Sequence, residues 1–153
     1  MTSNFRSILY IGTIDAEHTS RSRYKGLHKY SKRVDVLDVK PNHTILGKIK
    51  FKLFKGQTNK LDSYFEELME SNMYSLVWSD KPTYLSPERL LKIKEKYPQT
   101  IFVAHITDDV LQVKTMINEI DKVLSIFDYV FTPNKFNIEE FPEINFIYQE
   151  LGY

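Results

Sequence analysis

Six short apolar runs, most of them separated by segments with a helical pattern, constrain the fold of this chain more than any other feature. Strands that alternate with amphipathic helices form a parallel sheet, because each return to the next parallel strand needs a crossover helix. The expected strands cover residues 7–11, 34–39, 75–78, 101–104, 129–132 and 145–148. The sequence therefore predicts an α/β fold: a doubly wound parallel sheet of about six strands with helices on both faces.

The segments between these runs carry helix signals. Thr19 or Ser20 can cap a helix that runs to about residue 30, and Ser86-Pro87-Glu88 combines an N-cap with a proline at the first helical position. An apolar stripe between residues 113 and 127 predicts one continuous helix there. Residues 45–55 fit either a helix or a half-buried strand, and the helix is favoured because it suits a long crossover to the third strand.

The composition favours a single domain over residues 1–153, because 42% of the residues are hydrophobic and one alternating series of elements spans the chain. Without cysteine, the chain has no disulfide framework and no thiolate metal site. It shows neither a signal-peptide pattern nor an apolar run of about 20 residues that could span a bilayer. We therefore expect a cytoplasmic protein.

The charges are distributed unevenly along the chain. Residues 1–60 hold 13 Lys or Arg against 4 Asp or Glu, whereas residues 61–153 hold 8 against 16. A basic half can attract phosphate groups, acidic glycans, anionic lipids or nucleic acid. Equally, charges on solvated helix faces can segregate along a chain without any such partner.

Several common phosphate-binding and catalytic motifs are absent. The turn after the first strand reads Gly12-Thr13-Ile14-Asp15, which lacks the Gly-x-Gly-x-x-Gly pattern of dinucleotide-binding folds. The chain has no nucleoside-triphosphate loop ending in Gly-Lys-Ser or Gly-Lys-Thr, no zincin histidine spacing and no Gly-x-Ser-x-Gly elbow. These absences exclude the commonest doubly wound enzymes.

Two histidines are candidates for a general base. His18 lies in the loop after the first strand and His105 follows the fourth, so both are expected beyond the carboxyl edge of the sheet. An imidazole titrates near working pH and can take a proton from a substrate hydroxyl. The alternative for each is a structural histidine that is hydrogen-bonded within the fold.

The same loops supply candidate substrate-binding residues. Asp108 and Asp109 could hold polar hydroxyls or a metal, or cap the helix that follows them. Arg21 and Arg23 at the opening of the first helix suggest an anionic ligand or a solvated helix start. Tyr24, Trp78 and Tyr84 could form a sugar-stacking wall or belong to the core. The full substrate-binding set is Gly12, Thr13, Asp15, Thr19, Arg21, Asp80, Lys81, Asp108, Asp109, Asn134 and Lys135.

An ordered set of motifs resembles a known family. Its segments are Ile8-Leu9-Tyr10-Ile11-Gly12, residues 76–82 and 85–90, His105-Ile106-Thr107-Asp108-Asp109, residues 127–137 and Phe146-Ile147-Tyr148. Together they resemble the Rossmann-like N-terminal domain of GT-B glycosyltransferases, in particular the CgeB-like spore maturation protein family. The resemblance covers nearly the whole chain.

The resemblance implies a function. In this family two Rossmann-like domains face each other, the N-terminal one holding the acceptor and the C-terminal one the nucleotide-sugar. It therefore implies an acceptor domain for a glycan or cell-envelope hydroxyl, with His18 or His105 as base, no metal and no cofactor of its own. The donor domain is expected to be absent from this chain, so we expect it to be inactive alone. Its partner would then be a donor-domain protein or a second copy.

A non-catalytic alternative remains open. A binding or scaffolding module of the same fold could use the basic N-terminal half for a protein or polyanion partner; nucleic acid is not favoured. A small hydrolase at the same crevice ranks last, because no recognisable nucleophile is present.

Overall fold

The protein forms one six-stranded sheet in which all strands are parallel, so the expected α/β fold is confirmed. The structure is a computed structural model that describes residues 5–14, 19–39, 58–80, 82–116 and 119–150. Residues 45–55, left open between helix and strand, lie outside these ranges. The strands are β1 (Ile8–Gly12), β2 (Val34–Asp38), β3 (Leu76–Ser79), β4 (Ile101–His105), β5 (Tyr129–Thr132) and β6 (Phe146–Tyr148).

The strand order is β2-β1-β3-β4-β5-β6, so the direction of winding reverses between β1 and β3. The chain passes from β1 to β2 on one side of β1, whereas β3 pairs with β1 on its other side. This is a Rossmann-like, doubly wound topology. In such sheets, ligands bind beyond the carboxyl ends of the strands that flank the reversal.

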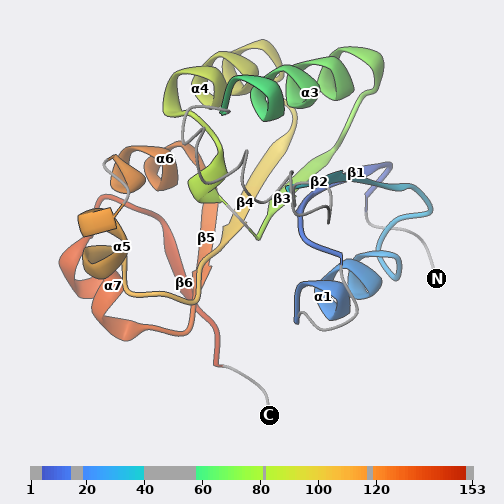
Figure 1. Ribbon diagram of the computed structural model, residues 1–153. Helices are drawn as coiled ribbons and strands as arrows, with labels where there is room; N and C mark the ends of the chain where they lie inside the picture. Colours follow the sequence, from blue (N-terminus) through green and yellow to red (C-terminus); the bar gives the residue numbers. More distant parts are fainter. Residues whose placement is uncertain (1–4, 15–18, 40–57, 81, 117–118, 151–153) are drawn as a thin grey trace, which may run out of the picture.

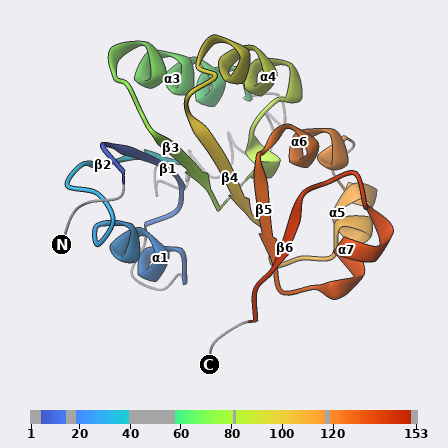
Figure 2. The same ribbon diagram turned by 180° about the vertical axis from the view of Figure 1, so that it is seen from behind.

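Helices cover both faces of the sheet. The described helical segments are α1 (Thr19–Leu27), α3 (Thr58–Ser71), the 3-10 turn η1 (Pro82–Tyr84), α4 (Pro87–Lys96), α5 (Val110–Met116), α6 (Ile120–Ile126) and α7 (Lys135–Glu140). Figures 1 and 2 show α3 and α4 together on one face of the sheet, with α1 on the opposite face.

Alternate residues of each strand face opposite layers, and this explains the continuous apolar runs. Leu9 and Ile11 belong to the larger core cluster, which includes residues of α3, α4, α5 and α6. Ile8 and Tyr10 face the other way and pack in a smaller cluster with Leu27 of α1. A strand that is buried on both sides has no solvent-facing position, so its sequence cannot alternate.

Two helix expectations need correction. The helix expected over residues 113–127 is two helices, α5 and α6, because Glu119 has a left-handed backbone (φ 74°) that does not continue an α-helix. The first helix ends at Leu27 rather than near residue 30, and Tyr30 lies beyond it and is 50% exposed.

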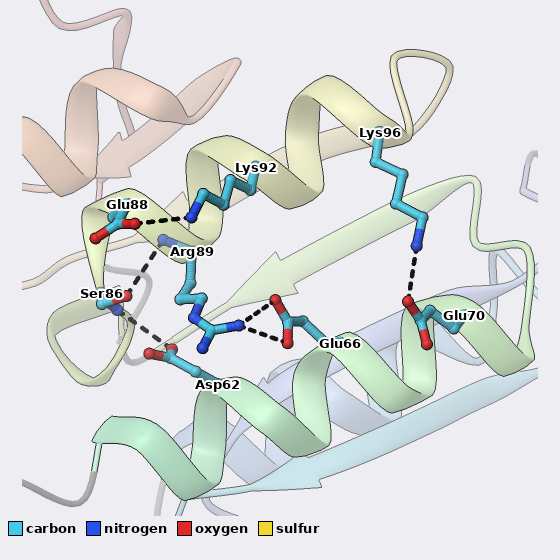
Figure 3. Close-up of polar contacts among 8 residues, drawn as sticks. All are labelled: Asp62, Glu66, Glu70, Ser86, Glu88, Arg89, Lys92 and Lys96. Carbon is cyan, nitrogen blue, oxygen red and sulfur yellow. Dashed lines mark hydrogen bonds and ion pairs between the residues drawn. The ribbon is translucent and has the colours of Figure 1, made fainter.

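Ion pairs join the two helices of the larger layer. The Arg89 guanidinium reaches both carboxylate oxygens of Glu66 at 2.7 and 2.8 Å, and Lys96 reaches Glu70 at 2.7 Å. Figure 3 shows both pairs crossing from α4 to α3. Since these side chains are partly or largely exposed, solvent screens each pair and its contribution to stability is small. The buried residues between the helices supply most of the stabilisation.

Candidate functional site

A small polar cavity of about 130 Å³ lies at the carboxyl edge of the sheet, beside the reversal of winding. At about 30 Å³ for each water molecule, it holds roughly four waters. It therefore suits a small polar group rather than a whole nucleotide. Three segments line it: Thr19, Ser20 and Arg23 of α1; Asp80, Pro82 and Thr83 after β3; and residues 105–108 from the end of β4 onward.

Asp80 is the polar centre of this edge. Its side chain is completely buried, and its Oδ2 atom accepts hydrogen bonds from the Tyr10 hydroxyl at 2.6 Å and from Arg23 Nε at 2.8 Å. Its Oδ1 atom accepts a third bond, from Trp78 Nε1 at 2.8 Å. A buried carboxylate is costly unless donors and a cation compensate it, and here all of them are present.

Tyr10 connects this centre to the core. Burial and the neighbouring Asp80 carboxylate raise the pKa of its phenol well above the usual value, so the hydroxyl stays protonated and donates. The ring lies over Gly12, where an added Cβ would come within 2.8 Å of the Tyr10 oxygen. Gly12 therefore leaves room for the Tyr10 side chain, and it does not line the cavity.

His105 is the last residue of β4 and lines the cavity, yet it is only 5% exposed. Within the described part of the chain its imidazole has no hydrogen-bond partner. Burial lowers the pKa of His105, and the positive charge of Arg23 lowers it further, while Asp80 acts in the opposite direction. The imidazole is therefore neutral near pH 7 and can accept a proton.

Arg23 reaches the cavity from α1, and its side chain is 26% exposed. It binds Asp80 through Nε, the inner edge of the guanidinium group. A guanidinium group has five N–H donors, and the terminal nitrogens of Arg23 have no partner among residues of the described ranges. The described residues thus hold the group through Nε and leave its terminal nitrogens able to bind a ligand.

The two neighbouring aspartates of the β4–α5 loop have different roles. Asp108 is exposed and lines the cavity. Asp109 caps α5, because its Oδ1 atom accepts a hydrogen bond from the Leu111 amide at 2.8 Å. The capping alternative is therefore correct for Asp109, which does not line the cavity.

Asn137 of α7, which the sequence did not single out, fixes this loop. Its side chain is 1% exposed and accepts a hydrogen bond from the Val110 amide at 2.9 Å. Its amide nitrogen lies 3.1 Å from the Asp108 carbonyl oxygen and 3.0 Å from Thr132 Oγ1, both of which can accept from it. Three segments meet at this one amide, so it positions the outer rim of the cavity.

The cavity brings together only part of the expected site. Thr19, Asp80, His105 and Asp108 line it, together with Ser20, Arg23, Thr83 and Thr107, which were outside the substrate-binding set. Tyr10 was also missed, because its contact with Asp80 spans 70 residues of sequence. The position of Asp80 directly after a buried strand was the signal that identified it.

Other candidates lie elsewhere or outside the described residues. Thr13 is buried and Arg21 is exposed, and neither lines the cavity. Asn134 caps α7 by accepting from the Phe136 amide at 3.0 Å, and the Lys135 ammonium lies 5.0 Å from the Tyr148 ring centre. Asp15, His18 and Lys81 fall outside the described residues.

The proposed stacking wall does not form at the cavity. Trp78 stacks on Phe131, with ring centres 5.6 Å apart, and Tyr24 packs against Tyr10 at the same separation. Neither they nor Tyr84 line the cavity. Trp78 and Tyr24 pack against the smaller core cluster and Tyr84 against the larger one.

Within the described ranges, no group of three or more His, Asp or Glu side chains is placed to hold a metal ion. No helix in that same part of the chain is long and apolar enough to cross a membrane. No family model, curated protein or solved structure matches this chain.

Proposed function

We propose that this domain binds a glycan or another hydroxyl-bearing cell-envelope acceptor in the carboxyl-edge cavity, for transfer of a sugar from a nucleotide-sugar held by a separate donor domain. The observation that supports this most is His105, a buried imidazole that faces the cavity without a protein hydrogen bond in the described ranges. The likeness of the sequence motifs to CgeB-like acceptor domains of the GT-B fold gives the same function.

The chemistry of transfer needs a base at the acceptor hydroxyl. As the acceptor oxygen bonds to the anomeric carbon of the donor, the bond from that carbon to the phosphate oxygen breaks. The electron pair of the broken bond leaves with the nucleoside diphosphate, and the proton of the acceptor hydroxyl passes to the imidazole of His105. The lowered pKa of His105 keeps this imidazole neutral and able to take the proton.

The size of the cavity supports the assignment of acceptor binding and donor binding to two separate domains. Space for roughly four waters suits the reacting end of an acceptor, but not a nucleotide-sugar beside it. The donor is therefore assigned to another domain, and this domain is inactive alone. The active form pairs it with a donor-domain protein or with a second copy.

One observation favours a second candidate, a binding module without catalysis. A catalytic base is commonly oriented by a hydrogen bond to a third group, and His105 makes none with the described residues. Such a module holds the same ligand without transferring sugar to it, or uses the basic N-terminal half for a protein or polyanion partner.

Calorimetry on the purified chain tests the proposal. The chain is titrated separately with cell-envelope glycans, with their constituent monosaccharides and with a panel of nucleotide-sugars. We expect saturable binding of one acceptor class and none of the nucleotide-sugars. Tight binding of a nucleotide-sugar by this chain alone would contradict its assignment as the acceptor half.

Transfer assays with a donor domain separate the two candidates. His105→Gln should bind the acceptor with similar affinity but lose about 100-fold or more in turnover, as expected for removal of a general base. His28→Gln is the matched control, because His28 is an exposed histidine of α1 that does not line the cavity. Equal turnover in both variants would exclude His105 as the base, whereas acceptor binding without any transfer by the wild type would favour the binding module.

A further inference from the structure

Three features of the cavity wall share one chemical preference. Arg23 is anchored by its Nε atom to a buried carboxylate, which Tyr10 and Trp78 hold in place. The guanidinium group is therefore preorganised, and its terminal nitrogens can form two parallel hydrogen bonds to one oxyanion.

The first turn of α1 provides the second feature. Thr19 and Ser20 begin this nine-residue helix and line the cavity, and no acidic residue occupies the first turn. The amide groups of a first turn lack partners within the helix, and the helix dipole favours negative charge at this end.

His105 is the third feature and is independent of the helix. It is 95% buried, faces the cavity and has no hydrogen-bond partner in the described ranges. Because it lines the cavity, this imidazole can take a partner there, from a ligand or from water. It can donate one hydrogen bond to an oxyanion or accept a proton from a neighbouring hydroxyl.

Among the described residues, two carboxylates also face this region and must be accounted for. Asp80 already accepts three hydrogen bonds and balances the charge of Arg23 from the inner side. Asp108 is exposed at the rim, where water screens its charge and it can bind a hydroxyl. The inner wall therefore favours an oxyanion, and the rim favours hydroxyl groups.

We infer that the ligand of this cavity carries a compact oxyanion, a phosphate or a carboxylate, next to its hydroxyl groups, and that Arg23 and the first turn of α1 bind this oxyanion. The inference rests on the proposed function in that it names the class of acceptor, an acidic or phosphorylated glycan unit. Arg23 is then the residue that discriminates this unit from a neutral sugar.

Nitrogen-15 NMR titration of the full chain tests the inference, with inorganic phosphate, glycerol 1-phosphate, glucuronate and glucose as probes at constant ionic strength. We expect inorganic phosphate or glucuronate to shift the resonances of Ser20, Arg23 and His105 saturably. The comparison of these two probes identifies which oxyanion is preferred. Glycerol 1-phosphate reports whether an adjacent hydroxyl improves binding.

Variants of Arg23 give the decisive comparison. Arg23→Gln should weaken binding of the preferred anion at least about tenfold, the loss of one or two charged hydrogen bonds. Lys25→Gln, an exposed cation of the same helix, should leave it unchanged. Because Arg23→Gln leaves the Asp80 charge unpaired, the double variant Arg23→Gln, Asp80→Asn is also tested and should show the same loss.

The outcomes separate this inference from the proposed function. Glucose that binds at the cavity while no anion does would overturn the inference and leave the acceptor proposal standing. Equal weakening by Arg23→Gln and Lys25→Gln would also overturn it, because diffuse attraction would then explain the binding. Anion binding that depends on Arg23, without sugar transfer in the presence of a donor domain, would support the inference and count against the transferase.

Discussion

The Tyr10 hydroxyl donates a hydrogen bond of 2.6 Å to the buried carboxylate of Asp80, joining the two strands on either side of the reversal of winding. Tyr10 pairs with Trp78 across β1 and β3, and Trp78 donates to the same carboxylate. Asp80 in turn holds Arg23 at the cavity. One carboxylate thus connects the sheet core to Arg23, the residue proposed to bind the oxyanion.

Tyr10→Phe should destabilise the fold by about 1.5–3 kcal/mol, because the buried Asp80 carboxylate loses one of its three hydrogen-bond donors. Urea unfolding followed by fluorescence of the single tryptophan, Trp78, measures the change. Tyr30→Phe is the control, since Tyr30 is 50% exposed. Equal stability of the two variants would show that the Tyr10–Asp80 bond contributes nothing.

Gly12→Ala and Gly26→Ala should have opposite effects. A Cβ at Gly12 would lie 2.8–2.9 Å from three atoms of Tyr10, so the side chain must move and the cost should be about 1–3 kcal/mol. A Cβ at Gly26, inside α1, meets nothing within 4 Å and should stabilise the protein by about 0.4–1 kcal/mol. Thermal unfolding of both variants checks the signs, and a stabilised Gly12→Ala would contradict the packing of Tyr10.

The stability of the wild type should fall as the pH is lowered below about 6.5, the ordinary pKa of histidine. Because the pKa of His105 is lowered in the folded protein, the unfolded chain binds more protons than the folded chain at pH values between the folded pKa of His105 and about 6.5. Stability therefore rises with pH in this window. Unfolding in urea at pH 7.0 and 5.5 measures the slope. It should be smaller in His105→Gln than in the wild type, and an equal slope in the two proteins would contradict the lowered pKa of His105.

Asp62 should oppose folding at neutral pH. It is 3% exposed, and burial raises the pKa of its carboxyl group more than the hydrogen bonds from Ser86 lower it. The folded chain therefore binds a proton at Asp62 more tightly than the unfolded chain does. This proton binding stabilises the fold at low pH, and the stabilisation is lost as the pH rises through the pKa of Asp62 in the folded protein. Asp62→Asn, which keeps an acceptor for the Ser86 amide shown in Figure 3, should be more stable than the wild type at pH 7.

Glu66→Gln is the matched control for Asp62→Asn, because it removes a carboxylate of the same helix whose ion pair with Arg89 is partly exposed to solvent. It should lower stability by less than about 1 kcal/mol. A loss of stability in Asp62→Asn that matches or exceeds the loss in Glu66→Gln would show that the charged form of Asp62 is favoured in the fold.

The strands were predictable because the sequence signal for each strand lies within the strand itself. The inner strands β1, β3 and β4 are largely buried on both faces, so a run of apolar residues marks each of them to within one or two residues, as with Ile101–His105. The break between α5 and α6 was not predictable, since the apolar stripe continues through it. Among the described residues, the left-handed backbone of Glu119 marks the interruption.

The candidate site was predictable only where a strand end identified it. Asp80 follows a buried strand and His105 ends one, and the topology places such residues at one edge. Tyr10 and Asn137 act through contacts across strands or helices, which have no signature in the sequence. Asp109 and Asn134 are residue types that often bind ligands. In this structure each side chain instead accepts a hydrogen bond from a backbone amide in the first turn of a helix.

The most direct test of the account is the side-chain nitrogen resonance of His105 during titration of the full chain with cell-envelope glycans and their acidic or phosphorylated units. We predict that a saturating acceptor shifts the His105 imidazole resonances and leaves those of His28 in place. Saturable binding that leaves His105 unchanged would contradict an acceptor site at the carboxyl edge of the sheet.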